Sequence, residues 1–425
     1  MLKKSKTILI FALALLICAT SFSTAFATNL NNDDALVGAE ENPVQAAITK
    51  NFRLPEATTI PDVSFNFIVT PIAVDGTEFD SAAPNMPTLG AQSEIPGVGT
   101  FTLSFSSADE SRKESVDDLV NTFSIQKETP NIFAGVTFPH AGVFVYTIRE
   151  EANTNYAIDD VTNVNEWLSY SPAVYTLTVY VANTANGLST YVYALGTLVT
   201  TPNPGQPGGI KVDPTPGGYD EEYLFSQIMF INDYVKNQGP LDPEEASTLS
   251  ISKTVTGDFA SKDRYFNFSI TLTIPSIVPN IPEFYRAYIV DTDGTVIGEP
   301  IEVSPGVATT FSLKHDQKLV FIDTPVGTSY DIIETGTPYY FPSLSVTTNG
   351  ATVDYPEREE GADFSSGQQF VGELTNSADF TNRRDTVTPT GLNLSNLPFI
   401  ILIVLGLGAL TAFVVVKIRK KARHH

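Results

Sequence analysis

The sequence predicts an all-β protein built from β-sandwiches. Apolar and polar residues alternate with a period of two in runs rich in β-branched and aromatic side chains; these runs are residues 63–69, 143–148, 175–181, 265–274 and 318–322. Asp-Gly pairs at 75–76 and 293–294 lie between such runs and are typical of hairpin turns. Outside the two ends of the chain, only residues 107–123 suit a helix, and a polar loop is the alternative there. Many short strands without alternating helices favour sandwiches.

Both ends of the chain carry targeting patterns. Residues 1–27 have a basic start, an apolar middle and small residues Ala25 and Ala27 at cleavage spacing, which predicts a secretory signal peptide. A lipoprotein signal at Cys18 is disfavoured because Ile17 stands where a small residue is needed. Residues 397–416 carry no charge and precede KIRKKARHH, which predicts one membrane-spanning helix with a cytoplasmic basic flank. We expect everything between the two segments to face outward.

Charge and cysteine content limit the partners and the chemistry. All 48 acidic residues lie between the two targeting segments, whereas eight of the 25 basic residues lie within them, so the outer part has a net charge of 17 − 48 = −31. Such a surface excludes nucleic acid as an expected partner. The single cysteine, Cys18, leaves with the signal peptide, so the exported chain has no disulfide.

The outer part divides into two strand-rich halves. Residues 237–247, NQGPLDPEEAS, are polar and contain two prolines, which is typical of a linker. We therefore expect a first domain at 28–236, a linker at 237–247, a second domain at 248–386 and a C-terminal signal at 387–425. The Pro- and Gly-rich residues 200–223 are interpreted as a long loop within the first domain.

The two halves repeat one constellation of polar residues in the same order. Each has a lysine near its first strand, a glutamate in a Y-x-I-x-E pattern and an asparagine near its last strand. Every member has the strand parity of neighbouring apolar residues, so all are expected to face the core. The members are Lys50, Glu150 and Asn232 in the first half, and Lys253, Glu334 and Asn382 in the second. Asn376 shares the parity of Asn382, so the second asparagine stays open between these two.

Lysine, glutamate and asparagine grouped in a core suit one reaction. Burial lowers the pKa of a lysine, so its amine becomes free to attack, and raises the pKa of a carboxyl. A protonated carboxyl can then polarise the carboxamide and move the proton. The product is a Lys–Asn isopeptide bond with loss of ammonia. For any one of these residues alone, a solvated face position would be the better interpretation.

On these motifs the chain resembles the backbone pilins of Gram-positive bacteria. The first half is similar to the streptococcal pilin isopeptide-linkage domain, and residues 249–334 resemble the collagen-adhesin B-type repeat. The resemblance implies tandem immunoglobulin-like sandwiches with self-formed Lys–Asn bonds. It assigns the cross-links to Lys50–Asn232 and Lys253–Asn382, and catalysis to Glu150 and Glu334.

The predicted bonds close large loops. They span 232 − 50 = 182 and 382 − 253 = 129 residues. In the chain-entropy treatment used for disulfides, each loop closure stabilises the folded state by about 5 kcal/mol. Tension that enters one terminal strand also passes through the bridge to the other.

The sequence TVTPTGL, residues 386–392, precedes the apolar helix and the basic tail, which is the arrangement of a sortase signal. By resemblance the site is Pro389-Thr390-Gly391, cleaved after Thr390, which becomes the acyl donor to a wall amine or to a lysine of another subunit. An ordinary single-span membrane protein is the alternative. Lys211, in GGIKVDP, is the expected inter-subunit acceptor, although the pilin motif ending in Tyr-Pro-Lys is absent.

We therefore expect a structural protein of the cell surface and cell wall, interpreted as a pilus shaft subunit. Its expected partners are sortase, other pilin subunits or peptidoglycan, and the membrane before sorting. The alternative is a monomeric wall-anchored adhesin that binds a host or neighbour-cell ligand. We expect no enzyme beyond single-turnover self-cross-linking, and no cofactor or metal, because no metal cluster, nucleotide loop or nucleophile triad is found in the sequence.

Overall fold

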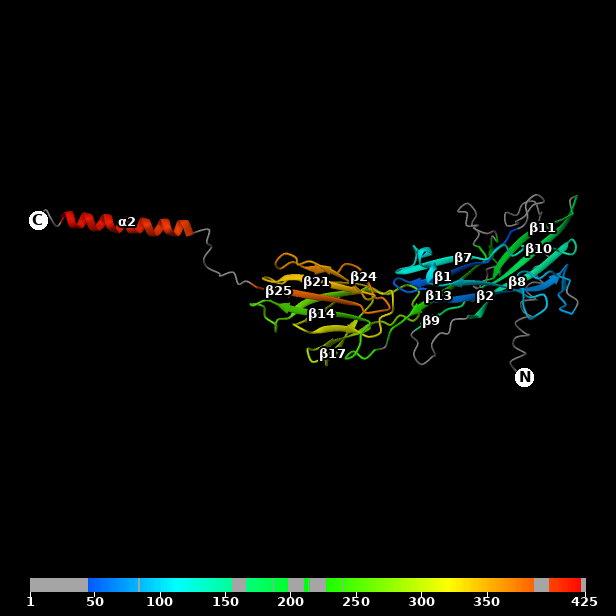
Figure 1. Cartoon of the computed structure of the whole chain (residues 1–425), viewed down its shortest axis with the longest axis horizontal. Coiled ribbons are helices and arrows are strands. Elements are labelled where there is room, and N and C mark those ends of the chain that lie inside the picture. The colour runs from blue at the N-terminus through cyan, green and yellow to red at the C-terminus, as the bar shows by residue number, and fades with distance from the viewer. Residues whose placement is uncertain are drawn as a thin grey trace.

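The computed structural model describes residues 45–82, 85–154, 166–185, 187–197, 210–212, 214, 227–239, 241–385 and 397–421. Their strands form two β-sandwiches that lie end to end (Figure 1). The fold is therefore all-β, as the sequence predicts.

Thirteen described strands and one short 3₁₀ helix form the first sandwich. They are β1 (Thr49–Pro55), β2 (Val63–Val74), β3 (Thr77–Glu78), β4 (Ala91–Gln92), β5 (Gly99–Phe105), η1 (Ser107–Arg112), β6 (Glu114–Ser115), β7 (Thr122–Glu128), β8 (Gly142–Thr154), β9 (Glu166–Leu168), β10 (Val174–Thr184), β11 (Gly187–Thr197), β12 (Ile210–Val212) and β13 (Met229–Lys236). One sheet has the order β6-β7-β1-β13-β9, and the other has β12-β11-β10-β8-β2-β5-β4, with β3 paired to β2.

The second sandwich contains the remaining strands. They are β14 (Leu249–Thr256), β15 (Phe266–Thr273), β16 (Tyr285–Val290), β17 (Val296–Val303), β18 (Thr309–Leu313), β19 (Lys318–Phe321), β20 (Ser329–Glu334), β21 (Phe341–Thr348), β22 (Ala351–Tyr355), β23 (Phe364–Ser365), β24 (Gln369–Phe370) and β25 (Ser377–Arg383). One sheet has the order β17-β16-β19-β14-β25-β21-β22, and the other has β18-β15-β20-β23, with β24 paired to β20.

Each sandwich has its own core, and the two core clusters share no residue. The strands that face these cores alternate buried and partly exposed residues, as β2 does along most of its twelve residues. This alternation follows from the pleat, which sends successive side chains to opposite faces of a sheet. The expected Asp-Gly hairpins are confirmed: Gly76 and Gly294 have φ angles of 79° and 87° between β2 and β3 and between β16 and β17.

The first and last strands of each sandwich are neighbours and run parallel. β1 pairs with β13 in the first sandwich, and β14 pairs with β25 in the second. Parallel neighbours in an otherwise antiparallel sandwich require the chain to cross between sheets before it returns. The consequence is that the entry strand and the exit strand of each domain lie side by side.

Polar contacts join the two sandwiches at their junction. The Asn121 side chain donates hydrogen bonds to the Ser329 hydroxyl and to the Thr273 carbonyl, both at 3.0 Å. Lys236, at the end of β13, forms an ion pair with Glu373 at 3.0 Å. These contacts bind the loop before β7 and the end of β13 to the second domain.

Residues 107–123 form neither one helix nor one loop. The capping box of Ser106 and Asp109 starts η1, and buried Asp109 forms an ion pair with Lys127. The helix ends after one short stretch because Glu114 and Ser115 pair with β7 as an edge strand. Backbone pairing to a sheet therefore replaces helix propagation there.

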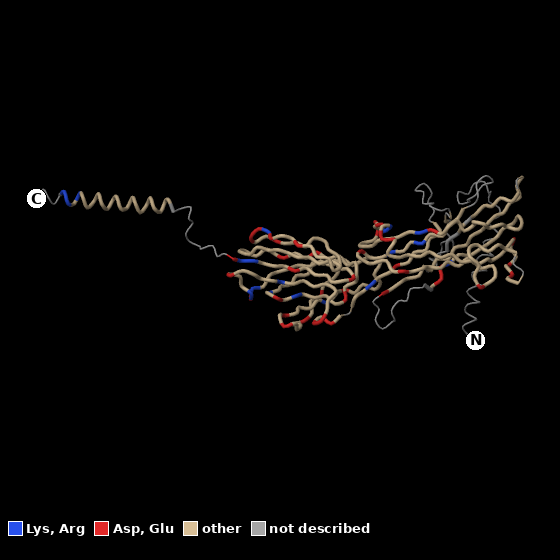
Figure 2. Tube along the Cα trace, viewed as in Figure 1, with Lys and Arg blue, Asp and Glu red and all other residues tan. Residues whose placement is uncertain are grey.

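The chain has one described helix long and apolar enough to cross a membrane, α2 (Leu397–Lys421), over Pro398–Lys420. Its described side chains pack against neither sandwich, since all are exposed. Figure 2 shows Lys and Arg gathered at its far end, and scattered Asp and Glu on both sandwiches.

Candidate cross-link sites

The first site joins the two sheets of the first sandwich. Lys50 lies on β1 and Asn232 on the neighbouring strand β13, whereas Glu150 lies on β8 of the opposite sheet. The Lys50 Nζ atom is 2.8 Å from Glu150 Oε1, and the Asn232 Nδ2 atom donates to the same oxygen at 2.7 Å. One carboxyl oxygen therefore contacts both nitrogen atoms of the expected reaction.

The second site has the same construction in the second sandwich. Lys253 lies on β14 and Asn382 on β25, while Glu334 lies on β20 of the opposite sheet. The Lys253 Nζ atom is 2.9 Å from Glu334 Oε1, and Asn382 Nδ2 donates to that oxygen at 2.7 Å. The structure therefore brings together all six residues that the sequence singled out, as two sets of three.

The six side chains are sequestered from water. Lys50, Lys253 and Asn232 have no exposed surface, and the other three are also buried. The lysine amines lie over aromatic rings, with Lys50 Nζ 4.1 Å from the centroid of Phe65 and Lys253 Nζ 4.5 Å from that of Phe266. A buried ammonium in such surroundings carries a large desolvation cost.

That cost changes the acidity of the groups. Desolvation lowers the pKa of Lys50 and of Lys253 from 10.5 to about 8, although the facing carboxyl acts in the opposite direction in each site. Desolvation also raises the pKa of Glu334 above 4.5, against the smaller effect of Lys253. Both changes favour the neutral pair, in which the amine has a free lone pair and the carboxyl holds the proton.

The carboxyl contacts differ in one respect from the expectation. In the expected reaction the protonated carboxyl polarises the carboxamide, which requires contact with its oxygen, but Glu150 and Glu334 contact the carboxamide nitrogen in the structure. An oxygen in contact with both the attacking and the leaving nitrogen is placed to move a proton from one to the other. Proton transfer is thus the role that these contacts favour.

The structure distinguishes Asn382 from Asn376. The Asn376 amide nitrogen donates to the backbone carbonyls of Thr248, Gly372 and Leu374, at 2.7 to 3.0 Å. Its oxygen accepts from two backbone N–H groups. Asn376 is therefore a buried residue whose side chain holds the loop before β25 through hydrogen bonds to its backbone. Asn382 is the asparagine that lies beside Lys253 and Glu334.

Sequence reasoning missed one contact of the first site. The backbone N–H of Ser171 donates to Glu150 Oε2 at 3.0 Å and to Asn232 Oδ1 at 3.1 Å. No side-chain pattern signals such a group, because every residue except proline has a backbone N–H.

The other expected residues have no described site. Lys211 lies on β12, where its backbone pairs with Leu195 at the edge of the larger sheet. Pro389, Thr390 and Gly391 of the predicted sorting signal lie outside the described residues, as do the predicted signal peptide and most of residues 200–223. Within that predicted loop, residues 210–212 form β12 instead, because they pair with β11.

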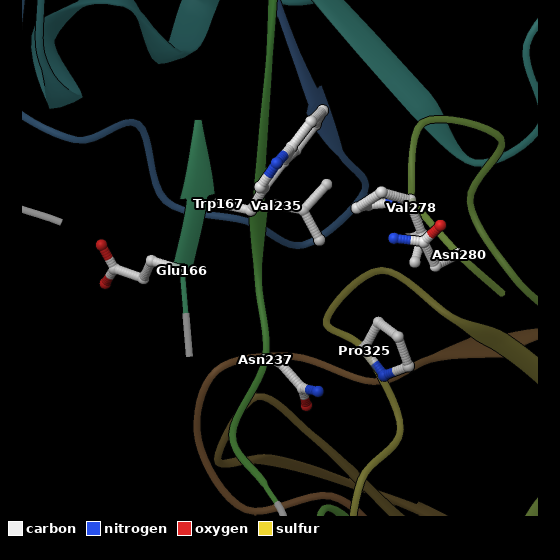
Figure 3. Close-up of a pocket in the computed structure, with 8 residues that line it drawn as sticks. Glu166, Trp167, Val235, Asn237, Val278, Asn280 and Pro325 are labelled. Atoms are coloured by element: carbon white, nitrogen blue, oxygen red, sulfur yellow. The ribbon is translucent and has the colours of Figure 1, made fainter. Parts of the chain in front are cut away.

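A cavity of about 280 Å³ lies at the domain junction and includes none of the six residues. Figure 3 shows Trp167 and Val235 from the first domain across from Val278 and Asn280 of the second, with Glu166 directed away from them. Across the described part of the chain, no group of three His, Cys, Asp or Glu residues is arranged to hold a metal ion.

Family models match both domains. Residues 88–207 match a Spy0128-like isopeptide containing domain, and residues 247–384 match a domain of unknown function. The first match covers the part of the chain that contributes Glu150 and Ser171. The second carries no functional description, so the likeness to a collagen-adhesin B-type repeat stays a prediction.

Two curated relatives are proteins of streptococcal pili. A pilin of Streptococcus pyogenes serotype M1 is 24% identical over 416 residues, which are 94% of this chain and 97% of the relative. The pilus tip adhesin Cpa of Streptococcus pyogenes is 30% identical over 177 residues, 40% of this chain but only 22% of the adhesin.

Solved structures give a weaker likeness. The major pilin from Streptococcus pyogenes aligns with a TM-score of 0.31 and 20% identity, over 81% of this chain and all of that chain. Sequence similarity carries the comparison instead: the chain resembles the Gram-positive backbone pilins along nearly its whole length, and its first domain resembles an isopeptide-containing pilin domain.

Proposed function

We propose that this relative of the Gram-positive backbone pilins is a pilus shaft subunit whose two sandwiches are each closed by a self-formed Lys–Asn isopeptide bond. The observation that carries the proposal is the repeated buried site: twice, a lysine on the first strand and an asparagine on the last meet one carboxyl oxygen. The similarity to a pilin over 94% of the chain supports the assignment to a shaft.

The reaction needs only the residues of each site. The neutral lysine Nζ attacks the asparagine Cγ, and the carbonyl electrons move to Oδ1 to give a tetrahedral intermediate. The glutamate passes a proton from the attacking nitrogen to the amide nitrogen, the Cγ–Nδ2 bond breaks, and ammonia leaves. The new amide is uncharged, so the cost of burying a charged lysine disappears.

The second-domain bond would bridge the strands through which force enters and leaves that domain. Pulling on the start of β14 and the end of β25 loads two parallel neighbours in opposite directions. With Lys253 joined to Asn382, tension crosses between the strands through covalent bonds. The 382 − 253 − 1 = 128 residues between them are then outside the load path, which suits the subunit of a fibre under tension.

Export and assembly follow from the two ends of the chain. The signal peptide would direct export, and α2 with its basic end would hold the precursor in the membrane until a sortase cuts after Thr390. The Thr390 acyl group would then be joined to Lys211 of another subunit or, at the base of the fibre, to a peptidoglycan amine. Both the sortase and the acceptor lysine are parts of the proposal that rest on sequence alone.

Ladder formation in a Gram-positive host that supplies the matching sortase tests the proposal. We expect the full chain to give SDS-resistant, high-molecular-weight ladders in wall extracts. Lys211→Ala should abolish them, whereas Lys262→Ala, which changes an exposed lysine of the second domain, should leave them intact. Ladders that persist in Lys211→Ala would reject that acceptor and leave the shaft assignment standing.

A monomeric wall-anchored adhesin is the second candidate, supported by the partial similarity to a pilus tip adhesin. It predicts wall retention as a single band with no ladder, together with binding of the purified chain to host or neighbouring cells. Wall retention without ladders would therefore replace the shaft assignment with this one.

A further inference from the structure

The two cross-link sites differ in the hydrogen bonding of the asparagine carboxamide oxygen. In the first domain, Asn232 Oδ1 accepts a hydrogen bond from the backbone N–H of Ser171 at 3.1 Å. In the second domain, Asn382 Oδ1 and Glu334 Oε2 are buried and have no hydrogen-bond partner among the described residues. The rest of the geometry is shared, so this N–H is a specific addition to the first site.

The backbone holds Ser171 over the site. β9 pairs with the end of β13, and Ser169 then makes two further bonds to Asp233: its N–H donates to the Asp233 carbonyl at 2.9 Å, and its hydroxyl accepts from the Asp233 N–H at 2.7 Å. The chain next crosses to β10 in the opposite sheet, whose strand partner is β8 with Glu150. Ser171 lies in this crossing, between the strand of Asn232 and the strand of Glu150.

We infer that the Ser171 N–H is an oxyanion donor for bond formation in the first domain, an inference that rests on the proposed isopeptide reaction. When Lys50 Nζ attacks Asn232 Cγ, the carbonyl electron pair moves to Oδ1, where the negative charge develops. A fixed N–H at hydrogen-bond distance from that oxygen stabilises the charge more strongly in the intermediate than in the amide. The pair returns to the carbonyl as the Cγ–Nδ2 bond breaks and Nδ2 leaves as ammonia with the proton that Glu150 carries.

The second contact of the same N–H, to Glu150 Oε2 at 3.0 Å, turns Oε1 toward both nitrogens. The one donor therefore serves the oxygen that gains charge and the group that moves the proton. The second domain reacts without such a donor, so its rate is an internal reference within every molecule.

The experiment follows bond formation by time-resolved intact mass. The chain without its predicted signal peptide and α2 is purified unfolded from urea, diluted to start folding, and quenched at intervals. Peptide mapping assigns each lost ammonia to one of the two domains. Ser171→Pro deletes the N–H, and Ser171→Ala is the matched control that removes the side-chain hydroxyl but keeps the N–H. If Ser171→Pro fails to fold, a backbone ester at residue 171 deletes the N–H alone.

We expect Ser171→Pro, or the ester, to slow the first-domain reaction about 100-fold, with Ser171→Ala near the wild-type rate and the second-domain rate unchanged in all variants. In Ser171→Pro or the ester, the maximum rate of the first-domain reaction should fall, while the pH values at which that rate rises and declines should stay the same. Equal first-domain rates for the wild type and the ester would overturn the inference, as would a shift of those pH values with an unchanged maximum rate, since the N–H would then alter proton binding and not the stability of the oxyanion. A wild-type chain that never loses ammonia from the first domain would instead reject the proposed reaction itself.

Discussion

Lys50 and Asn232 are offset by two residues across the parallel strands β1 and β13. Lys50 pairs in register with Phe230, two residues before Asn232. The second domain repeats the offset, because Lys253 pairs with Phe380, two residues before Asn382. An even offset keeps both side chains on the core face, and a slip of one residue would turn one of them to solvent. Register, as much as residue type, thus sets the cross-link geometry.

Closing the second domain should contribute a large part of its stability. For Glu334→Gln, which cannot accept and return the proton, we expect the free energy of unfolding of the second domain to fall by about 5 kcal/mol. Urea denaturation followed by tyrosine fluorescence measures it. Glu357→Gln is the matched control: it removes an exposed ion pair with Arg383, and solvent screens such pairs so that they contribute little to stability. Coinciding curves for Glu334→Gln and the wild type would contradict the stabilising role of the bond.

Bond formation in the second domain should have a bell-shaped pH dependence. The reactive pair is neutral Lys253 with protonated Glu334, which holds one proton in total, as the ion pair does. Above about pH 8, the lowered pKa of Lys253, the site loses this proton and the rate should fall. At low pH the pair gains a second proton, and because the pKa of Glu334 is raised, this limb should lie above 4.5.

The refolding assay across acidic, neutral and alkaline buffers measures this profile for the second-domain bond. A rate that keeps rising well above the lowered pKa of Lys253 would show that only the free amine matters and that the carboxyl proton has no part in the reaction.

Mechanical stretching between the two ends should separate bonded from unbonded domains. The wild type should show no unfolding extension from residues 253–382, whereas Glu334→Ala should release these 382 − 253 = 129 residues, at most about 460 Å of extended chain. Glu150→Ala should release 232 − 50 = 182 residues, at most about 660 Å. Single-molecule force spectroscopy measures both lengths, and wild-type traces with either extension would contradict a covalent bridge in that domain.

Strand parity alone predicted much of the candidate site. Because side chains alternate across a strand, the phase of Lys50 and Glu150 with their apolar neighbours indicates burial, and both side chains are buried. Parity does not give pairing between distant strands, so the choice between Asn376 and Asn382 needed the register of β14 and β25. The Ser171 contact is a backbone group in an irregular crossing, which leaves no pattern in the residue types.

Other features depended on contacts between distant segments. Composition could not decide whether the polar segment after Ser106 forms a helix or a loop. Its course depends on the pairing of Glu114 and Ser115 with β7. The contacts at the domain junction were also not predictable from local sequence, because Asn121 hydrogen-bonds Thr273 and Ser329, which lie more than a hundred residues along the chain. Hairpins joined by Asp-Gly were predictable because their turn chemistry is local.

The intact mass of the folded ectodomain, residues 28–386, tests covalent closure of the two domains most directly. We predict a mass lower than that of the plain sequence by two ammonia molecules. Glu150→Ala and Glu334→Ala should each lose only one ammonia, and the double variant should lose none. Glu357→Ala, an exposed control, should still lose two. A wild-type mass equal to that of the plain sequence would contradict the closure of either domain by an isopeptide bond.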